Sequence, residues 1–212
     1  MSPTTRRLGI ADPRRLLQRP TIYKAFLDLV GSHAATLRFS TDFVRAKSGD
    51  RILDVGCGPG RLIPYLPRVD YCGIDLDPRY LAHARALYGA SGARFHLRDL
   101  TADSSDFPER DFEIVVAFGL LHHLDDAGAA RLIDLCHERL RPGGRLVTID
   151  SVIDSRQSRA ARFLVSLDRG GHVRTAPAYE ELAGRRFGSV TTTILHDLLR
   201  IPYTHVILDC TK

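Results

Sequence analysis

The chain has 212 residues, of which 44% are hydrophobic and 26% are charged, and its formal net charge is +5. This length and balance predict one globular domain with a substantial core, and they exclude a disordered or fibrous chain. No apolar run approaches the roughly 20 residues of a membrane-spanning helix, and the start of the chain lacks the pattern of a secretory signal.

The four cysteines are Cys57, Cys72, Cys136 and Cys210, and their spacing contains no CxxC or CxxH pair. Zinc sites commonly show such pairs, so we expect no metal site. Cysteines that do not form a disulfide framework are typical of a reducing compartment. The sequence therefore predicts a cytoplasmic protein.

The positive net charge raises the question of a nucleic-acid partner. Beyond the first twenty residues, however, the arginines are scattered along the chain rather than clustered. Tryptophan is absent and aromatic residues make up only 8%, so no platform for stacking bases is evident. The sequence does not favour nucleic acid as a partner.

Along the chain, helices and strands alternate. Residues 21–46 show helical periodicity with Ile22, Phe26, Leu29 and Val30 on one face. Strands are then predicted at 51–55, 71–74, 94–97, 114–118 and 145–149, with helices at 78–88 and 127–139. Such alternation predicts right-handed βαβ units and a parallel sheet that helices cover on both faces.

The pattern changes after residue 150. A long polar and amphipathic segment, residues 151–177, precedes a helix at 178–185 and strands at 190–195 and 203–210. No crossover helix fits between these two strands, so the last strand is antiparallel. The predicted fold is α/β: a Rossmann-like, doubly wound, seven-stranded sheet that is mostly parallel, with an antiparallel last strand and helices on both faces.

The most informative motif follows the first predicted strand and precedes an expected helix: Asp54-Val55-Gly56-Cys57-Gly58-Pro59-Gly60. Glycines at these positions let the backbone turn tightly and approach a ligand closely. The dinucleotide fingerprint GxGxxG is not met, because Arg61 stands where it requires glycine. Asp54 would repel a pyrophosphate but suits a cationic ligand.

Acidic residues also follow the next two predicted strands. Asp75 ends the second strand about 20 residues past the first glycine, where a carboxylate can accept hydrogen bonds from both hydroxyls of a ribose. Asp77, directly before Pro78, is instead typical of a helix N-cap. Asp99 follows the third strand. Because the carboxyl ends of parallel strands share one edge, we expect Asp54, Asp75 and Asp99 to line one ligand site.

Taken together, these motifs resemble the class I S-adenosylmethionine-dependent methyltransferases. The matching segments are DVGCGPG at 54–60, GIDLDP at 73–78, RDL at 98–100, VVAFGLLHHL at 115–124 and LRPGGRL at 140–146. Within that superfamily they look like the group that includes the ubiquinone and menaquinone C-methyltransferases and many small-molecule methyltransferases. The resemblance implies S-adenosylmethionine as cofactor and S-adenosylhomocysteine as product.

Specific contacts are also implied by the resemblance. The backbone of Gly56, Cys57, Gly58 and Gly60 would hold the methionine moiety beside Asp54. Asp75 would bind the ribose hydroxyls, Leu76 would pack on adenine, Asp99 and the Leu100 amide would bind adenine polar atoms, and the Phe118 carbonyl would face the methionine amine.

His122 and His123 follow the fourth strand, where one of them could deprotonate an acceptor. The alternatives are that they orient the loop, or that methyl transfer needs only in-line approach.

Several acceptor classes are disfavoured. The Asn/Asp-Pro-Pro-Tyr/Phe motif of base amino-methylation is absent, and no cysteine is suitably placed as a nucleophile. A small molecule (metabolite, sugar, lipid or natural-product precursor), methylated at O, N or C, remains as the expected acceptor.

Arginine binds carboxylate or phosphate through paired hydrogen bonds, so Arg174 and Arg200 suggest an anionic acceptor. The alternative is that these arginines form surface ion pairs. The residues predicted to surround the acceptor are Tyr23, Phe26, Asp150, Arg169, Arg174, Asp197, Arg200 and Tyr203.

We therefore expect residues 1–50 to form an N-terminal arm and helical cap, whose helix either closes the site or simply docks on the core. Residues 51–212 are expected to form the S-adenosylmethionine-binding domain, with a substrate-recognition insertion at about 151–177. Two alternatives to methyl transfer remain open. The fold could serve a non-methylating reaction, or the chain could be a non-catalytic regulatory protein that binds the cofactor.

Overall fold

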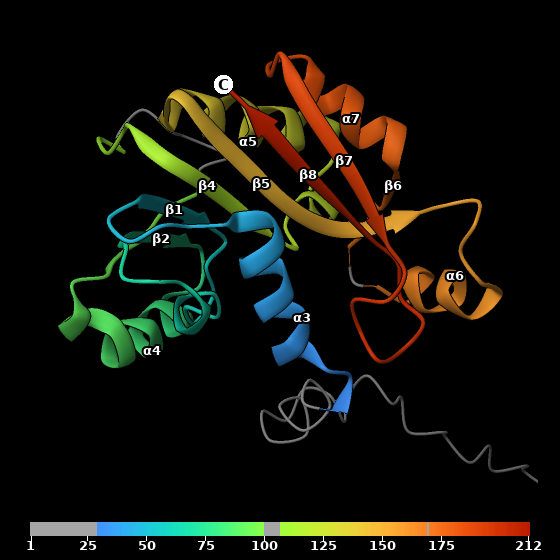
Figure 1. The fold of residues 1–212 in the computed structure, drawn as a ribbon, viewed down its shortest axis with the longest axis horizontal. Helices are drawn as coiled ribbons and strands as arrows, with labels where there is room; N and C mark the ends of the chain where they lie inside the picture. The colour runs from blue at the N-terminus through green and yellow to red at the C-terminus, as the bar shows by residue number, and fades with distance from the viewer. Residues whose placement is uncertain (1–28, 100–106, 169) are drawn as a thin grey trace, which may run out of the picture.

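The computed structural model describes residues 29–99, 107–168 and 170–212. Its centre is a sheet with the strand order β3-β2-β1-β4-β5-β8-β7 (Figure 1). A further strand of two residues, β6, pairs with the end of β5 outside this order. The strands are β1 (Arg51–Val55), β2 (Asp70–Asp75), β3 (Arg94–Leu97), β4 (Phe112–Phe118), β5 (Leu140–Ile153), β6 (Arg174–Thr175), β7 (Ser189–Leu195) and β8 (His205–Thr211).

Strand directions confirm the predicted fold class. The strands from β3 to β5 pair in parallel, whereas β8 is antiparallel to both β5 and β7. Two details of the strands differ from the sequence prediction. Strand β6 falls in the segment 151–177, where no strand was predicted, because two residues are too few to show an alternating pattern. Strand β5 begins earlier than expected, because Leu140 pairs with Phe112 before a register shift.

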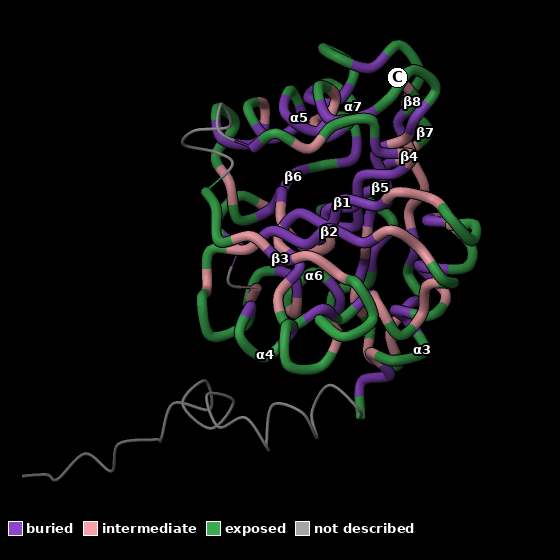
Figure 2. Tube along the Cα trace, turned by 90° about the vertical axis from the view of Figure 1, so that its left-hand side faces the viewer, coloured by how far each residue is buried: buried purple, intermediate pink, exposed green. Residues whose placement is uncertain are grey.

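The helices form a layer on each face of the sheet (Figures 1 and 2). Helices α5 (Asp126–Arg139) and α7 (Ala176–Gly184) pack on one face, and α3 (Ser32–Arg38) and α4 (Pro78–Tyr88) lie on the other. The strands between these layers are largely buried (Figure 2). No helix within residues 29–99, 107–168 and 170–212 has the length and apolarity needed to cross a membrane. The α-helices are α3 (Ser32–Arg38), α4 (Pro78–Tyr88), α5 (Asp126–Arg139), α6 (Arg159–Ser166) and α7 (Ala176–Gly184).

Local capping explains where some of these helices start. The side chain of Asp77 accepts a hydrogen bond from the Arg79 backbone N–H, and Pro78 occupies the first turn of α4. The predicted N-cap role of Asp77 is therefore confirmed. Asp125 caps α5 in the same way, by accepting from the Gly128 N–H.

The N-terminal helix and the helix after the glycine motif differ from the prediction. Within the described residues, the helical stretch consists of α3 and a π-helical continuation, Phe39–Val44. Tyr23 and Phe26 lie outside the described residues. The helix expected after the glycines is reduced to a 3₁₀ turn, Ile63–Tyr65. Pro64 and Pro67 oppose a longer helix, because proline lacks an N–H and disfavours helical backbone in the residue before it.

Candidate active site

A glycine-rich loop follows the carboxyl end of β1. The three glycines of this glycine loop (residues 56–60) have φ between +53° and +79°, which side-chain-bearing residues rarely adopt. A Cβ added at Gly58 would meet no atom of the described chain within 4 Å. The Gly58 N–H donates to Asp75 Oδ2 at 2.8 Å, and the Asp77 N–H donates to Asp75 Oδ1 at 2.8 Å. Asp75 thus holds the glycine loop against the end of β2.

Asp54 lies buried at the end of β1, just before the loop. The Tyr71 hydroxyl donates to its Oδ2 at 2.6 Å, whereas Oδ1 is buried with no partner among the described residues. Burial raises the pKa of Asp54 to about 7; the hydrogen bond from Tyr71 opposes this rise and the charge of Asp75 adds to it. A buried oxygen of this kind requires a donor. It therefore fits a ligand with N–H groups at the glycine loop, as the implied cofactor has.

The other residues implied for the cofactor lie along the same edge. Leu76, directly after β2, is exposed, as a residue that packs on a ligand ring would be in the free protein. Asp99 is exposed beyond the end of β3. Cys57 is buried in the core beside Gly73, so only its backbone can face a ligand. Phe118 ends β4, and its ring packs edge-on against Phe39 with a centroid separation of 5.2 Å. Leu100 lies outside the described residues.

Beside the ends of β4 and β5 there is a cavity of about 580 Å³, a size typical of sites for small organic molecules. Apolar residues such as Ala35 of α3, Leu164 of α6 and Leu198 form part of its wall. Its polar lining includes Arg61, His122, Asp150, Ser151, Asp168, Tyr203 and His205. These residues come from the position directly after the glycine loop, the segment after β4, strand β5, the segment after α6, and β8 with the segment before it. The cavity is therefore assembled from distant parts of the sequence.

His122 lies in the wall of this cavity between two carboxylates. Its Nδ1 is 2.8 Å from Asp150 Oδ1, and its Nε2 is 3.5 Å from Asp168 Oδ1. Burial by itself lowers the pKa of His122, but Asp150 and Asp168 outweigh it and raise this pKa to about 9. His122 is therefore a cation at neutral pH, and this protonation state does not suit a general base.

Asp168 joins His122 to the rest of the polar wall. Its carboxylate accepts hydrogen bonds from the Ser151 hydroxyl at 2.8 Å, from the Gly170 N–H at 2.9 Å and from the Tyr203 hydroxyl. Burial opposes its ionisation, but these hydrogen bonds and His122 hold the pKa of Asp168 far below its ordinary value. We refer to His122, Asp150, Ser151, Asp168 and Tyr203 as the His122 cluster.

Two polar atoms of the cavity-lining residues lack a partner among the described residues. They are Asp150 Oδ2 and His205 Nδ1, and both are buried. Burial lowers the pKa of His205 to about 4, so its ring is neutral at pH 7. These two buried atoms are hydrogen-bonding groups of the lining residues that the described chain leaves unsatisfied.

The two adjacent histidines occupy different environments. His122 is buried in its cluster, whereas His123 is exposed and does not line the cavity. Their ring centroids lie 4.2 Å apart, and partial burial together with the charge of His122 lowers the pKa of His123. The geometry does not support the predicted catalytic role of His123.

The predicted acceptor residues are only partly brought together. Asp150 and Tyr203 line the cavity. Asp197 does not: its side chain is 72% exposed and pairs with Arg38 at 3.1 Å. Arg200 is exposed outside the cavity lining, with its side chain against Gly31. Arg169 lies outside the described residues.

Arg174 has a structural position instead of the predicted acceptor-binding one. It is 9% exposed, and its guanidinium donates to the carbonyls of Leu121, Leu124 and His172 at 2.7–3.0 Å. It also donates to Asp126 at 2.8 Å. All of these partners belong to the chain itself, so the guanidinium stabilises the segment after β4 and is not available to bind an anion.

Replacing Arg174 by alanine is expected to lower the free energy of unfolding by about 2–4 kcal/mol, because buried carbonyls lose their donor. Urea denaturation measures the change. The exposed Arg200→Ala should stay within about 0.5 kcal/mol of the parent protein. An Arg174→Ala protein of parental stability would contradict this structural role.

The charge of His122 also predicts how stability depends on pH. Its pKa is about 9 in the folded protein and about 6.5 when unfolded. Its contribution to stability is therefore complete below about pH 6.5 and is lost as the pH rises through about 9. The measurement is urea denaturation across this range for the parent and His122→Asn proteins. Their stability difference should shrink as the pH rises; a difference independent of pH would contradict the assigned protonation state.

Several residues of the cavity had not been singled out from the sequence. Arg61, Ser151, Asp168 and His205 are ordinary polar residues without a motif, and they come from four separate elements or connections. One local signal existed for Ser151, because it follows Asp150 at the carboxyl end of a central strand. Nothing local distinguishes Asp168 or His205 from surface residues.

A family model and a relative that match this chain are both described as methyltransferases. Residues 52–144 match a family model described as a methyltransferase domain. Over 101 residues the chain is 34% identical to the ubiquinone biosynthesis O-methyltransferase of Cereibacter sphaeroides. That match covers 47% of this chain and 40% of the relative, so the chain spans less than half the length of that protein.

Solved structures share the fold at low sequence identity. A TehB-like SAM-dependent methyltransferase from Corynebacterium glutamicum has a TM-score of 0.66 and 21% identity, covering 95% of this chain and 100% of that one. The cyclase SpnF has a TM-score of 0.64 and 17% identity, covering 84% of this chain and 80% of that one. One fold is thus found in proteins named for different reactions.

Proposed function

We propose that the chain transfers a methyl group from S-adenosylmethionine to a small-molecule acceptor in the cavity. The match of residues 52–144 to a methyltransferase domain supports this proposal. The observation that carries the proposal is the position of the cavity. It adjoins Arg61, which directly follows the glycine loop, and Phe118 at the end of β4, where the implied methionine moiety would lie. A molecule in the cavity would therefore be next to the cofactor.

The glycine loop and the residues at the carboxyl ends of β1, β2 and β3 would hold the cofactor. The glycine loop offers its backbone to the methionine moiety, and the unpartnered Asp54 Oδ1 offers an acceptor for an N–H group. Asp75 would bind the ribose hydroxyls, with Leu76 on one face of adenine and Asp99 at its polar edge. When bound, S-adenosylmethionine supplies a methyl group on a sulfonium, which is reactive toward nucleophiles.

The acceptor we propose is an uncharged molecule with an apolar body and a hydroxyl or amine group. The apolar wall suits the body, and Asp150 Oδ2 can accept a hydrogen bond from the O–H or N–H group. An uncharged acceptor is favoured, because Arg61 and the charged His122 balance Asp150 and Asp168 in the lining, and Arg174 and Arg200 lie outside it. His122 holds Asp150 in place, and positioning of the acceptor is the main contribution of the protein.

The proposal extends to the roles of two segments of the chain and to its location. Residues 151–177 supply Leu164 and Asp168 to the cavity wall, which supports a role for this segment in recognising the acceptor. Residues 30–36 also line it, which supports a capping role for the N-terminal region. We further propose a cytoplasmic location, because all four cysteines are free and buried.

Methyl transfer is tested by incubating the full chain with methyl-labelled S-adenosylmethionine and a panel of phenols, alcohols and amines. The expected result is label in one acceptor and an equal amount of S-adenosylhomocysteine. If the acceptor changes without transfer of label, the non-methylating alternative holds. If calorimetry shows cofactor binding but no acceptor in a broad panel changes, the non-catalytic alternative holds.

A further inference from the structure

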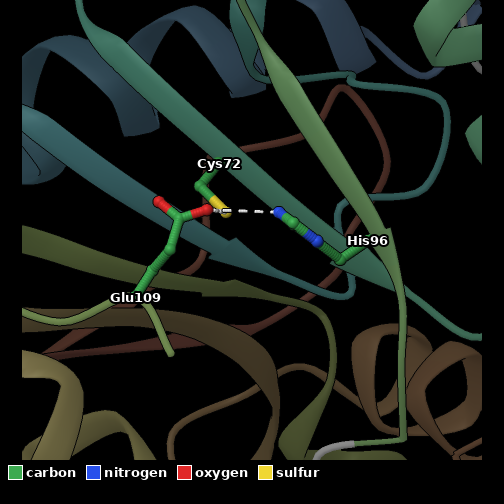
Figure 3. A group of neighbouring side chains, drawn as sticks. All are labelled: Cys72, His96 and Glu109. Atoms are coloured by element: carbon green, nitrogen blue, oxygen red, sulfur yellow. Dashed lines mark hydrogen bonds and ion pairs between the residues drawn. The ribbon is translucent and has the colours of Figure 1, made fainter. Parts of the chain in front are cut away.

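Away from the cavity, three side chains with different ligand chemistries converge where β2 and β3 pair (Figure 3). Cys72 lies on β2, His96 lies on β3, and Glu109 lies on the stretch that leads to β4. Their sulfur, nitrogen and oxygen ligand atoms all lie within 4.8 Å of one another. The proposed methyl transfer uses none of them. We propose that these three side chains bind a zinc ion.

The distances between the ligand atoms match those around a tetrahedral zinc ion. Cys72 Sγ is 3.6 Å from Glu109 Oε1, and His96 Nε2 is 3.2 Å from the same oxygen. With usual zinc bond lengths, a tetrahedron places sulfur and oxygen about 3.5 Å apart and nitrogen and oxygen about 3.3 Å apart. Two of the three distances between ligand atoms therefore match a tetrahedron, and the third, between Cys72 and His96, is within 4.8 Å. Water can take the fourth corner, because the His96 side chain is 35% exposed.

The register of the sheet explains why these residues meet. In the parallel pairing of β2 with β3, Cys72 is opposite Arg94 and Ile74 is opposite His96. Side chains two residues apart on a strand share a face, so Cys72 and His96 lie on the same face of the sheet. The Phe107 ring packs edge-on against His96 with a centroid separation of 5.4 Å. This contact helps place the His96 ring beside the stretch that carries Glu109.

Arg94 keeps Glu109 ionised and leaves room for the metal. Its hydrogen bonds to Glu109 lower the pKa of that carboxyl. The stronger one reaches Oε2 at 2.7 Å, and Arg94 also binds Asp70 at 2.6 Å. A second donor, Arg94 Nε, lies 3.2 Å from Oε1. Of the contacts that Arg94 makes, zinc would displace only this weaker one, and the bond to Oε2 would still orient the carboxylate.

Zinc must also replace the proton of the Cys72 thiol. Without metal, this thiol donates a hydrogen bond to Glu109 Oε1 at 3.6 Å and therefore carries a proton. On binding, a zinc–sulfur bond forms, the S–H bond breaks, and the proton passes to solvent. The thiolate and carboxylate together balance the two charges of the ion. Because a proton is released, affinity should increase with pH.

The test uses Co²⁺ as a spectroscopic probe for zinc in the untagged full chain. Coordination by Cys72 should give a thiolate-to-cobalt charge-transfer absorption that saturates at one Co²⁺ per chain. Added Zn²⁺ should abolish it. The absorption should disappear in Cys72→Ala, and His96→Asn should weaken Co²⁺ binding at least about tenfold.

The matched control is His83→Asn, since His83 is an exposed histidine on α4 outside the cluster. It should bind Co²⁺ as the parent protein does. His96→Asn keeps the test decisive if Cys72→Ala fails to fold, because His96 is only partly buried. Absence of the absorption in the parent, or its persistence with unchanged affinity in His96→Asn, overturns the zinc site.

Discussion

Replacing Asp75 by alanine is expected to weaken binding of S-adenosylmethionine by about 1–3 kcal/mol, or about 5- to 150-fold in dissociation constant. Two losses combine in this effect. The ribose hydroxyls lose the proposed charged acceptor. The glycine loop loses its restraint as well, because Asp75 Oδ2 accepts the Gly58 N–H at 2.8 Å in the structure itself. Isothermal calorimetry with S-adenosylhomocysteine, which does not turn over, measures the change.

Asp77, two residues after Asp75, provides a matched control for this substitution. Asp77→Ala removes a neighbouring carboxylate that caps α4 and makes no contact with the glycine loop. It should cost about 1 kcal/mol of stability and leave cofactor affinity nearly unchanged. Equal cofactor affinity in folded Asp75→Ala and parent proteins would remove Asp75 from the cofactor site.

The second large effect is expected on stability, from His122→Ala. Removing this imidazolium leaves Asp150 buried without its charged partner and takes one partner from Asp168. Breaking a buried ion pair in this way costs about 3–5 kcal/mol. The free energy of unfolding in urea at pH 7 should fall by that amount.

The adjacent His123 provides the control, because it has the same side chain in an exposed position. His123→Ala should change stability by no more than about 0.5 kcal/mol. It should also keep methyl transfer within a few-fold of the parent rate, since His123 does not line the cavity. A large loss of turnover in His123→Ala would return the catalytic role to this histidine. Similar stability losses in both variants would contradict the environment assigned to His122.

The zinc proposal and the methyl-transfer proposal are independent, because they rest on different residues. The Cys72, His96 and Glu109 group lies where β2 and β3 pair, whereas the cavity lies beside the ends of β4 and β5. The loss of charge-transfer absorption in Cys72→Ala concerns only the metal. The loss of cofactor affinity in Asp75→Ala concerns only the methyltransferase site. Failure of one proposal therefore leaves the other intact.

The sequence by itself determined the order of the seven main strands, the helices α4, α5 and α7, the antiparallel last strand, the cap at Asp77 and the resemblance to methyltransferases. These features depend on neighbouring residues. A buried strand, a proline after a capping aspartate and closely spaced glycines each leave a short pattern in the chain. The resemblance over residues 54–146 depended on such patterns, because each of its segments is local.

Only the tertiary structure decided which side chains meet. Arg174 was expected to bind an anion, yet packing directs its guanidinium to three carbonyls of its own chain. His122 and His123 are indistinguishable in sequence, and only the first reaches Asp150 and Asp168. Cys72, His96 and Glu109 likewise show no ligand spacing. The physical reason is common to all of these cases: strand register, side-chain direction and burial bring distant residues together, and a sequence pattern records only local conformation.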